Sequence, residues 1–176
     1  MTNDLVLFES PLDQPIPVLI LSGKPKEHAK VRLLLEPVEW LFYGASTFAE
    51  ARIILQEHVI AVVITETALI DGRWTTLFVC TASNPNPPYI IPLADLEDHE
   101  FWAEAFNEGA FDVVYRPIVK TPIVRAITVA FQRWKRAAER EEAKGATPIT
   151  LVWPVRKSRA SRSRWFSTKV LAAGQN

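Results

Sequence analysis

The chain of 176 residues is 48% hydrophobic and carries 20 basic residues, 20 acidic residues and one cysteine, Cys80. This composition is typical of one soluble domain with its own core, and a single cysteine excludes a disulfide framework and a thiolate-rich zinc site. No apolar segment approaches the roughly eighteen residues that would span a bilayer, so we expect a cytoplasmic protein without a membrane span.

The formal net charge of zero conceals an uneven distribution of charge along the chain. After Glu142 no acidic residue follows, whereas seven basic residues do: Lys144, Arg156, Lys157, Arg159, Arg162, Arg164 and Lys169. Subtracting these seven from the 20 basic residues leaves 13 against 20 acidic residues, so residues 1–143 carry about −7. We therefore divide the chain into a leader at 1–16, a domain at 17–143 and a basic, flexible tail at 144–176.

The domain alternates unbroken apolar runs, typical of strands buried on both faces, with segments of helical period. Thr47 and Glu50 form a capping box, Gly109 stands at a helix C-cap, and Thr121 with Pro122 begins the last helix. We predict strands at 17–21, 38–45, 59–64, 89–93 and 112–115, and helices at 26–36, 47–58, 74–82, 98–108 and 121–143. Such strict alternation predicts an α/β fold, a doubly wound five-stranded parallel sheet with helices on both faces.

The apolar run at 59–64 is predicted to be the central strand of this sheet. Thr65 and Glu66 are the first polar residues after it, which places a carboxylate at the carboxyl end of a central strand. In an open parallel sheet, ligands and partners bind at this edge. Asp71 and Gly72 then indicate a turn before the next helix.

Three stretches together resemble the receiver domain of bacterial two-component response regulators, which has a flavodoxin-like fold. They are VVITE at 62–66 with LIDGRW at 69–74, WAEAFNEGAFDVV at 102–114, and YRPI at 115–118. The last two resemble the family's alanine-rich helix, Gly-Ala, aromatic residue, Asp, strand and Lys-Pro-Phe. The resemblance covers about residues 17–140 and implies a phosphorelay signalling module without a catalytic step of its own.

The resemblance also implies a set of site positions. In the family, two acidic residues after the first strand and an aspartate after the third hold magnesium, and this aspartate accepts a phosphoryl group from a histidine kinase. A hydroxyl residue after the fourth strand and a lysine before a proline after the fifth bind the phosphoryl oxygens. At the matching positions this chain has Ser22 and Gly23 for the acidic pair, Glu66 for the aspartate, Leu93 and Ala94 for the hydroxyl site, and Arg116 before Pro117 for the lysine.

Every one of these positions departs from the family pattern. We therefore expect no metal site and no cofactor, and we expect phosphoryl transfer to be absent or very inefficient. A dianionic phosphoryl group needs a metal ion and a cation to offset its charge. As an alternative use of the pocket, we hypothesise that Glu66 and Arg116 stand at neighbouring strand ends and pair through two parallel hydrogen bonds.

By the same resemblance, receivers commonly dimerise through the face that contains the fourth and fifth helices. We place this interaction face on Trp102, Phe106, Phe111 and Tyr115. A set of aromatic residues also fits a hydrophobic core better than a cofactor site. For two of them, Phe106 and Phe111, the core and the interaction face both stay open. The set assigned to the core is Phe101, Phe106, Phe111, Phe131 and Trp134.

The resulting interpretation is a degenerate, stand-alone receiver that binds a protein partner, either a signalling protein or a histidine kinase, and is compatible with a homodimer. Two alternatives stay open. One is a phosphoryl-accepting receiver with atypical site residues. The other is a nucleic-acid-associated regulator that binds through the basic tail, where 156–169 also carries Trp165 and Phe166.

Overall fold

The computed structural model describes residues 15–36, 40–95 and 100–143, so the predicted tail and nearly all of the predicted leader lie outside the described residues. In the described part, five parallel strands form one sheet in the order β2-β1-β3-β6-β7, and two short strands form an antiparallel ribbon. The sheet contains β1 (Ile16–Leu21), β2 (Trp40–Ala45), β3 (Val62–Glu66), β6 (Tyr89–Asp95) and β7 (Val114–Arg116), and the ribbon contains β4 (Ala68–Leu69) and β5 (Gly72–Arg73).

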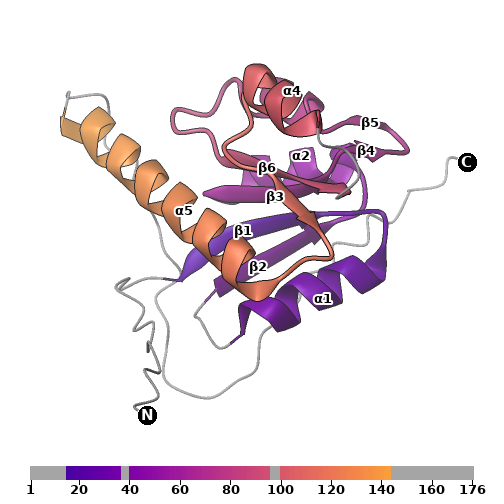
Figure 1. The fold of residues 1–176 in the computed structure, drawn as a ribbon. Helices are drawn as coiled ribbons and strands as arrows, with labels where there is room; N and C mark the ends of the chain where they lie inside the picture. Colours follow the sequence, from indigo (N-terminus) through magenta and orange to yellow (C-terminus); the bar gives the residue numbers. More distant parts are fainter. Residues whose placement is uncertain (1–14, 37–39, 96–99, 144–176) are drawn as a thin grey trace, which may run out of the picture.

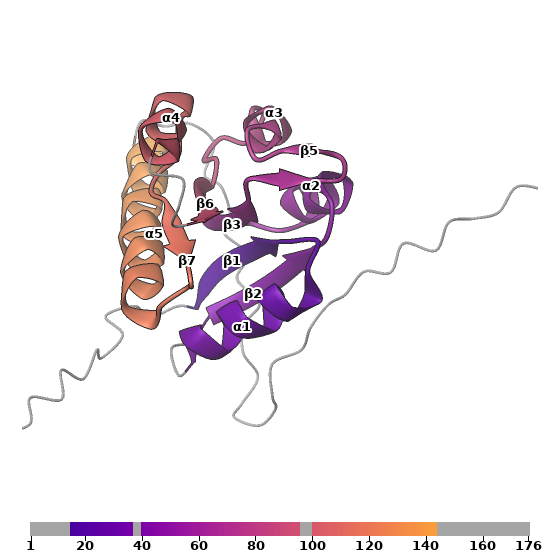
Figure 2. The same ribbon diagram turned by 45° about the vertical axis from the view of Figure 1, so that its right-hand side comes forward.

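Helices cover both faces of the sheet, as the strict alternation predicts (Figures 1 and 2). The helices are α1 (Pro25–Leu35), α2 (Phe48–Glu57), α3 (Thr76–Thr81), α4 (Phe101–Glu108) and α5 (Lys120–Ala143). α1 and α5 pack on one face, and α2, α3 and α4 pack on the other. The doubly wound parallel sheet is therefore confirmed. No helix in the described ranges is long and apolar enough to cross a membrane.

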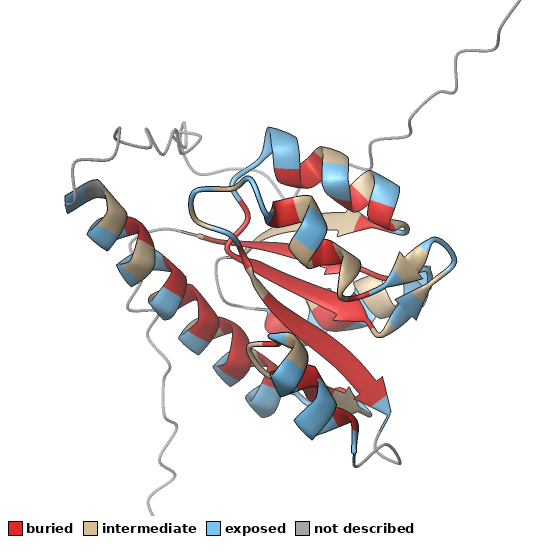
Figure 3. Cartoon of the chain, turned by 90° about the horizontal axis from the view of Figure 1, so that it is seen from above, coloured by how far each residue is buried: buried red, intermediate tan, exposed pale blue. Residues whose placement is uncertain are grey.

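The two cores follow from the alternation of side chains along the strands. In β1, Val18 and Ile20 face α1 and α5, whereas Leu19 and Leu21 face the helices on the other side. All four side chains are fully buried, which explains why the run contains no polar residue. Figure 3 shows the burial of the whole sheet: the strands in the middle are mostly buried, and each helix is buried on one side and exposed on the other.

The central strand is shifted relative to the prediction. It spans Val62–Glu66 rather than 59–64, because the apolar residues before it belong to the loop that enters the sheet. Val59 is 45% exposed, and Ala61 is buried and donates a backbone hydrogen bond to the Pro17 carbonyl at 3.1 Å. Apolar character alone thus marks the buried run and not the first residue of the strand.

Two local signals read from the sequence are confirmed. Thr47 caps α2 by accepting a hydrogen bond from the Glu50 N–H at 3.2 Å, while the Glu50 carboxylate accepts one from the Ser46 N–H at 2.8 Å. Gly109 ends α4 with a φ of 105°, the left-handed conformation that glycine adopts without a Cβ penalty.

The structure also separates the two interpretations left open for the aromatic residues. Phe101, Phe131 and Trp134 are buried and belong to the cores, as predicted. Phe106 remains 38% exposed, so its assignment to the core is wrong: it follows Ala105, whose side chain points to the sheet, and therefore faces outward. Phe111 is partly buried against the core on the α5 side.

Candidate functional site

Ser22 and Glu66 meet at the carboxyl edge of the sheet because their strands are paired neighbours. β1 and β3 are parallel with Leu21 opposite Thr65, so the next position along the two chains brings Ser22 opposite Glu66. Ser22 is fully buried, and Glu66 is only 9% exposed. A buried carboxylate requires hydrogen-bond partners or a counter-charge, and both are present.

Each oxygen of the Glu66 carboxylate has its own partner. The Ser22 hydroxyl donates a hydrogen bond to Oε1, and the Lys24 ammonium lies 3.4 Å from Oε2. The Lys24 side chain is 65% exposed while that of Glu66 is 12% exposed, so the lysine covers the carboxylate from the solvent side. The carboxylate is thus neutralised by a cation that the protein itself supplies.

The turn after β1 holds these groups in place. The Lys24 N–H donates a hydrogen bond to the Ser22 hydroxyl oxygen at 3.0 Å, and the Ser22 carbonyl accepts one from Nε2 of His28 at 2.7 Å. Since a carbonyl oxygen can only accept, this ring nitrogen must carry the proton. Ser22 therefore joins the turn, α1 and Glu66 in one network of hydrogen bonds.

Arg116 does not pair with Glu66, and this part of the predicted pocket is wrong. In the described part of the chain, the Arg116 guanidinium instead donates a hydrogen bond to the Leu93 carbonyl at 3.1 Å. Its nitrogens lie 3.6 Å from a carboxylate oxygen of Asp95 and 3.9 Å from one of Glu27. The strand order gives the reason. Arg116 is on β7 and β6 separates it from β3, so the two strand ends are not neighbours but about 10 Å apart.

The positions that the resemblance assigns to phosphoryl binding have no hydroxyl group available. Leu93 and Ala94 are buried, and Leu93 stands opposite Glu66 in the pairing of β3 with β6. The hydroxyl of the buried Thr65 donates to the Glu66 carbonyl at 2.9 Å and is already used. Pro117 follows Arg116 through a cis peptide bond.

The segment after Glu66 folds as the β4–β5 ribbon, which the sequence did not reveal. Asp71 at its turn does not approach the pocket: its carboxylate accepts hydrogen bonds from the N–H groups of Phe48 and Ala49, both at 3.1 Å. These are unpaired donors of the first turn of α2, where a negative charge is favourable. Asp71 thus caps a helix and adds no carboxylate to the pocket.

The pocket residues do not fit a magnesium ion. Mg²⁺ prefers an octahedral shell of oxygen ligands with one or two carboxylates. Among the described residues, Glu66 is the one carboxylate of this network, and the Lys24 ammonium beside it would repel a second cation. In the residues that the structure describes, no group of three or more His, Cys, Asp or Glu side chains could hold a metal ion.

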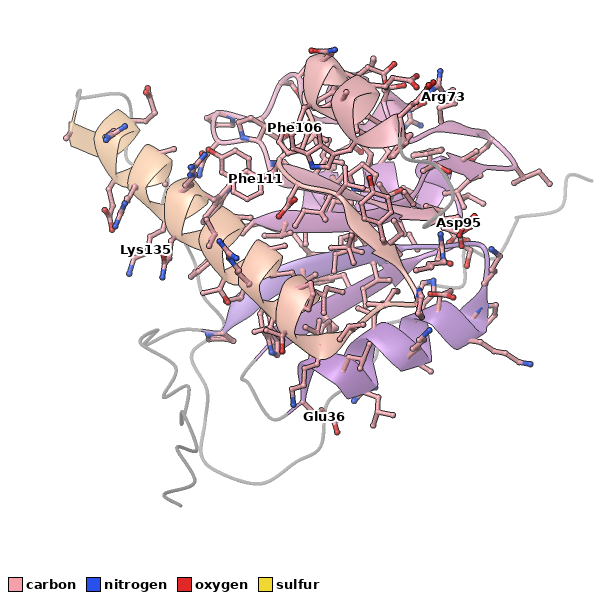
Figure 4. The ribbon with its side chains drawn as sticks, viewed as in Figure 1. Glu36, Arg73, Asp95, Phe106, Phe111 and Lys135 are labelled. Atoms are coloured by element: carbon pink, nitrogen blue, oxygen red, sulfur yellow. The ribbon has the colours of Figure 1, made fainter. Side chains whose placement is uncertain are left out.

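The four residues predicted as an interaction face do not form one exposed surface. Trp102 and Phe106 lie together on α4 with ring centroids 4.5 Å apart and are 51% and 38% exposed. Phe111 and Tyr115 are partly buried and pack against the two opposite cores. Figure 4 shows Phe106 on α4 and Phe111 beside α5. The exposed part of the predicted face is therefore the aromatic pair of α4.

Cys80 on α3 is half-buried and packs against the core. Burial is the main cause that raises the pKa of its thiol; the nearby charge of Asp71 acts in the same direction, and that of Arg52 in the opposite one. A raised pKa keeps the thiol protonated at neutral pH, whereas thiol chemistry needs the thiolate.

Several solved structures with a similar arrangement of strands and helices are receiver domains. The signal receiver domain of an HD domain-containing protein from Pseudomonas fluorescens is 20% identical, with 76% of this chain and 99% of that chain covered and a TM-score of 0.65. A response regulator receiver domain protein from Clostridium thermocellum is 24% identical, with 69% and 98% covered and a TM-score of 0.60.

A beryllofluoride-activated NtrC4 receiver domain, solved as a dimer, is 18% identical, with 67% and 98% covered and a TM-score of 0.60. No protein-family model matches the chain, and comparison with curated proteins finds no match. The similarity is therefore one of structure, carried by the strand order and the helices on both faces. This chain has the flavodoxin-like fold of the receiver domains of two-component response regulators.

Proposed function

We propose that the protein is a receiver-type signalling module that binds a protein partner without being phosphorylated. The observation that supports this proposal most is that both oxygens of the Glu66 carboxylate already have partners within the protein. Its two oxygens contact the Ser22 hydroxyl and the Lys24 ammonium, and no second carboxylate from the described ranges joins them in this network. Glu66 stands at the position that corresponds to the phosphoryl-accepting aspartate.

The charge balance of the pocket argues against a phosphoryl group. The Glu66 carboxylate and the Lys24 ammonium already neutralise each other. A phosphoryl group would bring a charge of about −1.5 to −2 in place of the carboxylate. Arg116, the nearest equivalent of the family's lysine, is directed to the Leu93 carbonyl and to carboxylates of Glu27 and Asp95. The added charge would thus remain largely uncompensated in a buried position.

The Ser22, Lys24 and Glu66 contacts can instead hold the end of the sheet in one conformation. In a regulated receiver, an acquired charge biases two conformations of nearby segments. Here an internal ion pair and a buried hydroxyl take this position without an acquired charge. The module would therefore act by binding alone, with no catalytic step.

The exposed aromatic pair of α4 is the surface we assign to the partner. Large aromatic residues are enriched among the residues that dominate protein interfaces. Trp102 and Phe106 contact each other and remain exposed. The partner class that fits is a signalling protein or a histidine kinase, or a second copy of the same chain.

Partner binding with and without a phosphodonor tests this proposal. The intact protein is immobilised, proteins retained from a lysate of its own cells are quantified by mass spectrometry, and self-association is measured by analytical ultracentrifugation. We expect the same binding with and without acetyl phosphate and Mg²⁺. Replacing Trp102 and Phe106 by alanine should weaken it at least about tenfold, as truncation of central interface residues does.

A variant with Leu33→Ala and Val79→Ala is the matched control, since these exposed apolar residues lie on α1 and α3. It should bind as the unmodified protein does. Binding that appears only after treatment with the phosphodonor would contradict the proposal. An equal loss in both double variants would contradict the assignment of the surface to α4.

A further inference from the structure

Three arginines form a row on α5, far along the chain from the pocket at Glu66. Arg133, Arg136 and Arg140 follow one another at spacings of three and four residues. At about 100° per residue they lie within about 60° of one another around the helix axis. Together with Ala137 and Tyr89, they line a surface hollow of about 280 Å³.

These arginines are available for a ligand. Across the ranges that the structure describes, none of their guanidinium groups has an ion-pair partner. Arg133 lies over the ring of Phe111, with 5.3 Å from its guanidinium carbon to the ring centroid, and Phe111 contacts Tyr89 with ring centroids 4.6 Å apart. Phe111 thus supports one guanidinium, and Tyr89 forms one wall of the hollow.

From this arrangement we infer that the α5 arginine row binds single-stranded nucleic acid. Guanidinium groups bind phosphate oxygens through two parallel hydrogen bonds, and the helix spaces these arginines about 4.5 and 6 Å apart along its axis. A row of this kind can follow successive phosphates of one strand. Tyr89 beside the row offers a ring on which an unpaired base can stack.

The distribution of charge favours a flexible polyanion over a membrane or an acidic peptide. Residues 1–143 carry about −7, so a flat anionic membrane approaching α5 would also face the acidic body. A single strand is narrow enough to contact the arginine row alone and to avoid that body. An acidic peptide would leave the aromatic wall of the hollow without a stacking partner.

The test compares two variants of the full-length chain that lose the same charge. Arg136→Gln with Arg140→Gln removes two members of the row, and Arg125→Gln with Lys135→Gln removes two exposed cations of α5 that do not line the hollow. Lys135 lies on the side of α5 away from Phe111 (Figure 4). Circular dichroism confirms that both variants fold before binding is measured.

Binding is measured by fluorescence anisotropy with a labelled oligothymidylate of about 16 nucleotides, a length typical of single-strand sites. We expect the first variant to bind about tenfold more weakly than the unmodified chain, because it loses two charge-assisted contacts. The slope of log K against log salt should fall in magnitude by about 1.4, or about 0.7 for each lost contact. The control variant should keep both the affinity and the slope within experimental error.

Four results would overturn the inference. One is no salt-dependent binding of the oligonucleotide, and another is an equal loss in the two variants, which would indicate attraction to net charge alone. A third is unchanged binding by the first variant, which would assign the contact to the tail. The fourth is binding of polyglutamate, or of phosphatidylserine vesicles, as tight as that of the oligonucleotide.

Discussion

Replacing Trp74 by alanine will lower the free energy of unfolding by about 3–5 kcal/mol, the cost typical of removing a large aromatic side chain from a core. Trp74 is fully buried, and its ring meets Phe78 edge-on with centroids 5.6 Å apart. Its backbone N–H donates to the Thr67 carbonyl at 3.1 Å, which ties the segment after Glu66 to the core and which the substitution leaves in place. Urea denaturation followed by far-UV circular dichroism measures the change.

Trp102→Ala is the matched control for this prediction, because it makes the same chemical change at a side chain that is 51% exposed. Its free energy of unfolding should change by no more than about 0.5 kcal/mol. Trp74→Phe should cost far less than Trp74→Ala, since the indole N–H of Trp74 is buried without a hydrogen-bond partner in the described residues. A loss below about 1 kcal/mol for Trp74→Ala would contradict the assignment of Trp74 to the core.

The second large effect is the conversion of the pocket into a cation site. We expect Gly23→Asp combined with Lys24→Ala to give a protein that Mg²⁺ stabilises. The double change removes the ammonium that neutralises Glu66 and adds a second carboxylate after β1. A Cβ at Gly23 would meet Leu69 Cδ2 at 3.7 Å, an ordinary contact, so the new side chain fits. Two carboxylates near one point form the ligand pair that Mg²⁺ binds.

Thermal unfolding with and without MgCl₂ measures this stabilisation. At a Mg²⁺ concentration ten times its dissociation constant, the double variant should gain about 1.4 kcal/mol, and its melting temperature should rise with Mg²⁺ concentration. The unmodified protein and Gly23→Asp combined with Lys26→Ala, which keeps Lys24, should show no such rise. The same rise in the unmodified protein would mean that Lys24 does not exclude the cation.

The architecture could be predicted from the sequence because its signals are local. Unbroken apolar runs identify strands buried on both faces, and the alternation of strands with helices restricts the topology to few solutions. The cap at Thr47 and the left-handed glycine at Gly109 rest on backbone groups a few residues apart. Glu66 was located in the same way, as the first charged residue after the central run.

The partners of the site residues could not be predicted, since they depend on strand order and on where long side chains reach. The pair of Glu66 with Arg116 required β3 and β7 to be neighbours, and β6 lies between them. Lys24 is not among the predicted pocket residues, although its position two residues after Ser22 lets it reach Glu66. The β4–β5 ribbon has two residues in each strand, too few for any period in the sequence.

The central claim concerns the Glu66 carboxylate, which stands where a receiver of this fold would accept a phosphoryl group. We claim that the Lys24 ammonium and the buried Ser22 hydroxyl bind its two oxygens and so prevent phosphoryl transfer. Incubating the unmodified full-length protein with acetyl phosphate and Mg²⁺, followed by intact-mass and peptide mass spectrometry, tests it most directly. We predict no Mg²⁺-dependent gain of a phosphoryl group at Glu66. A phosphoryl group that appears on Glu66 in the presence of Mg²⁺ and is absent with EDTA would contradict the claim.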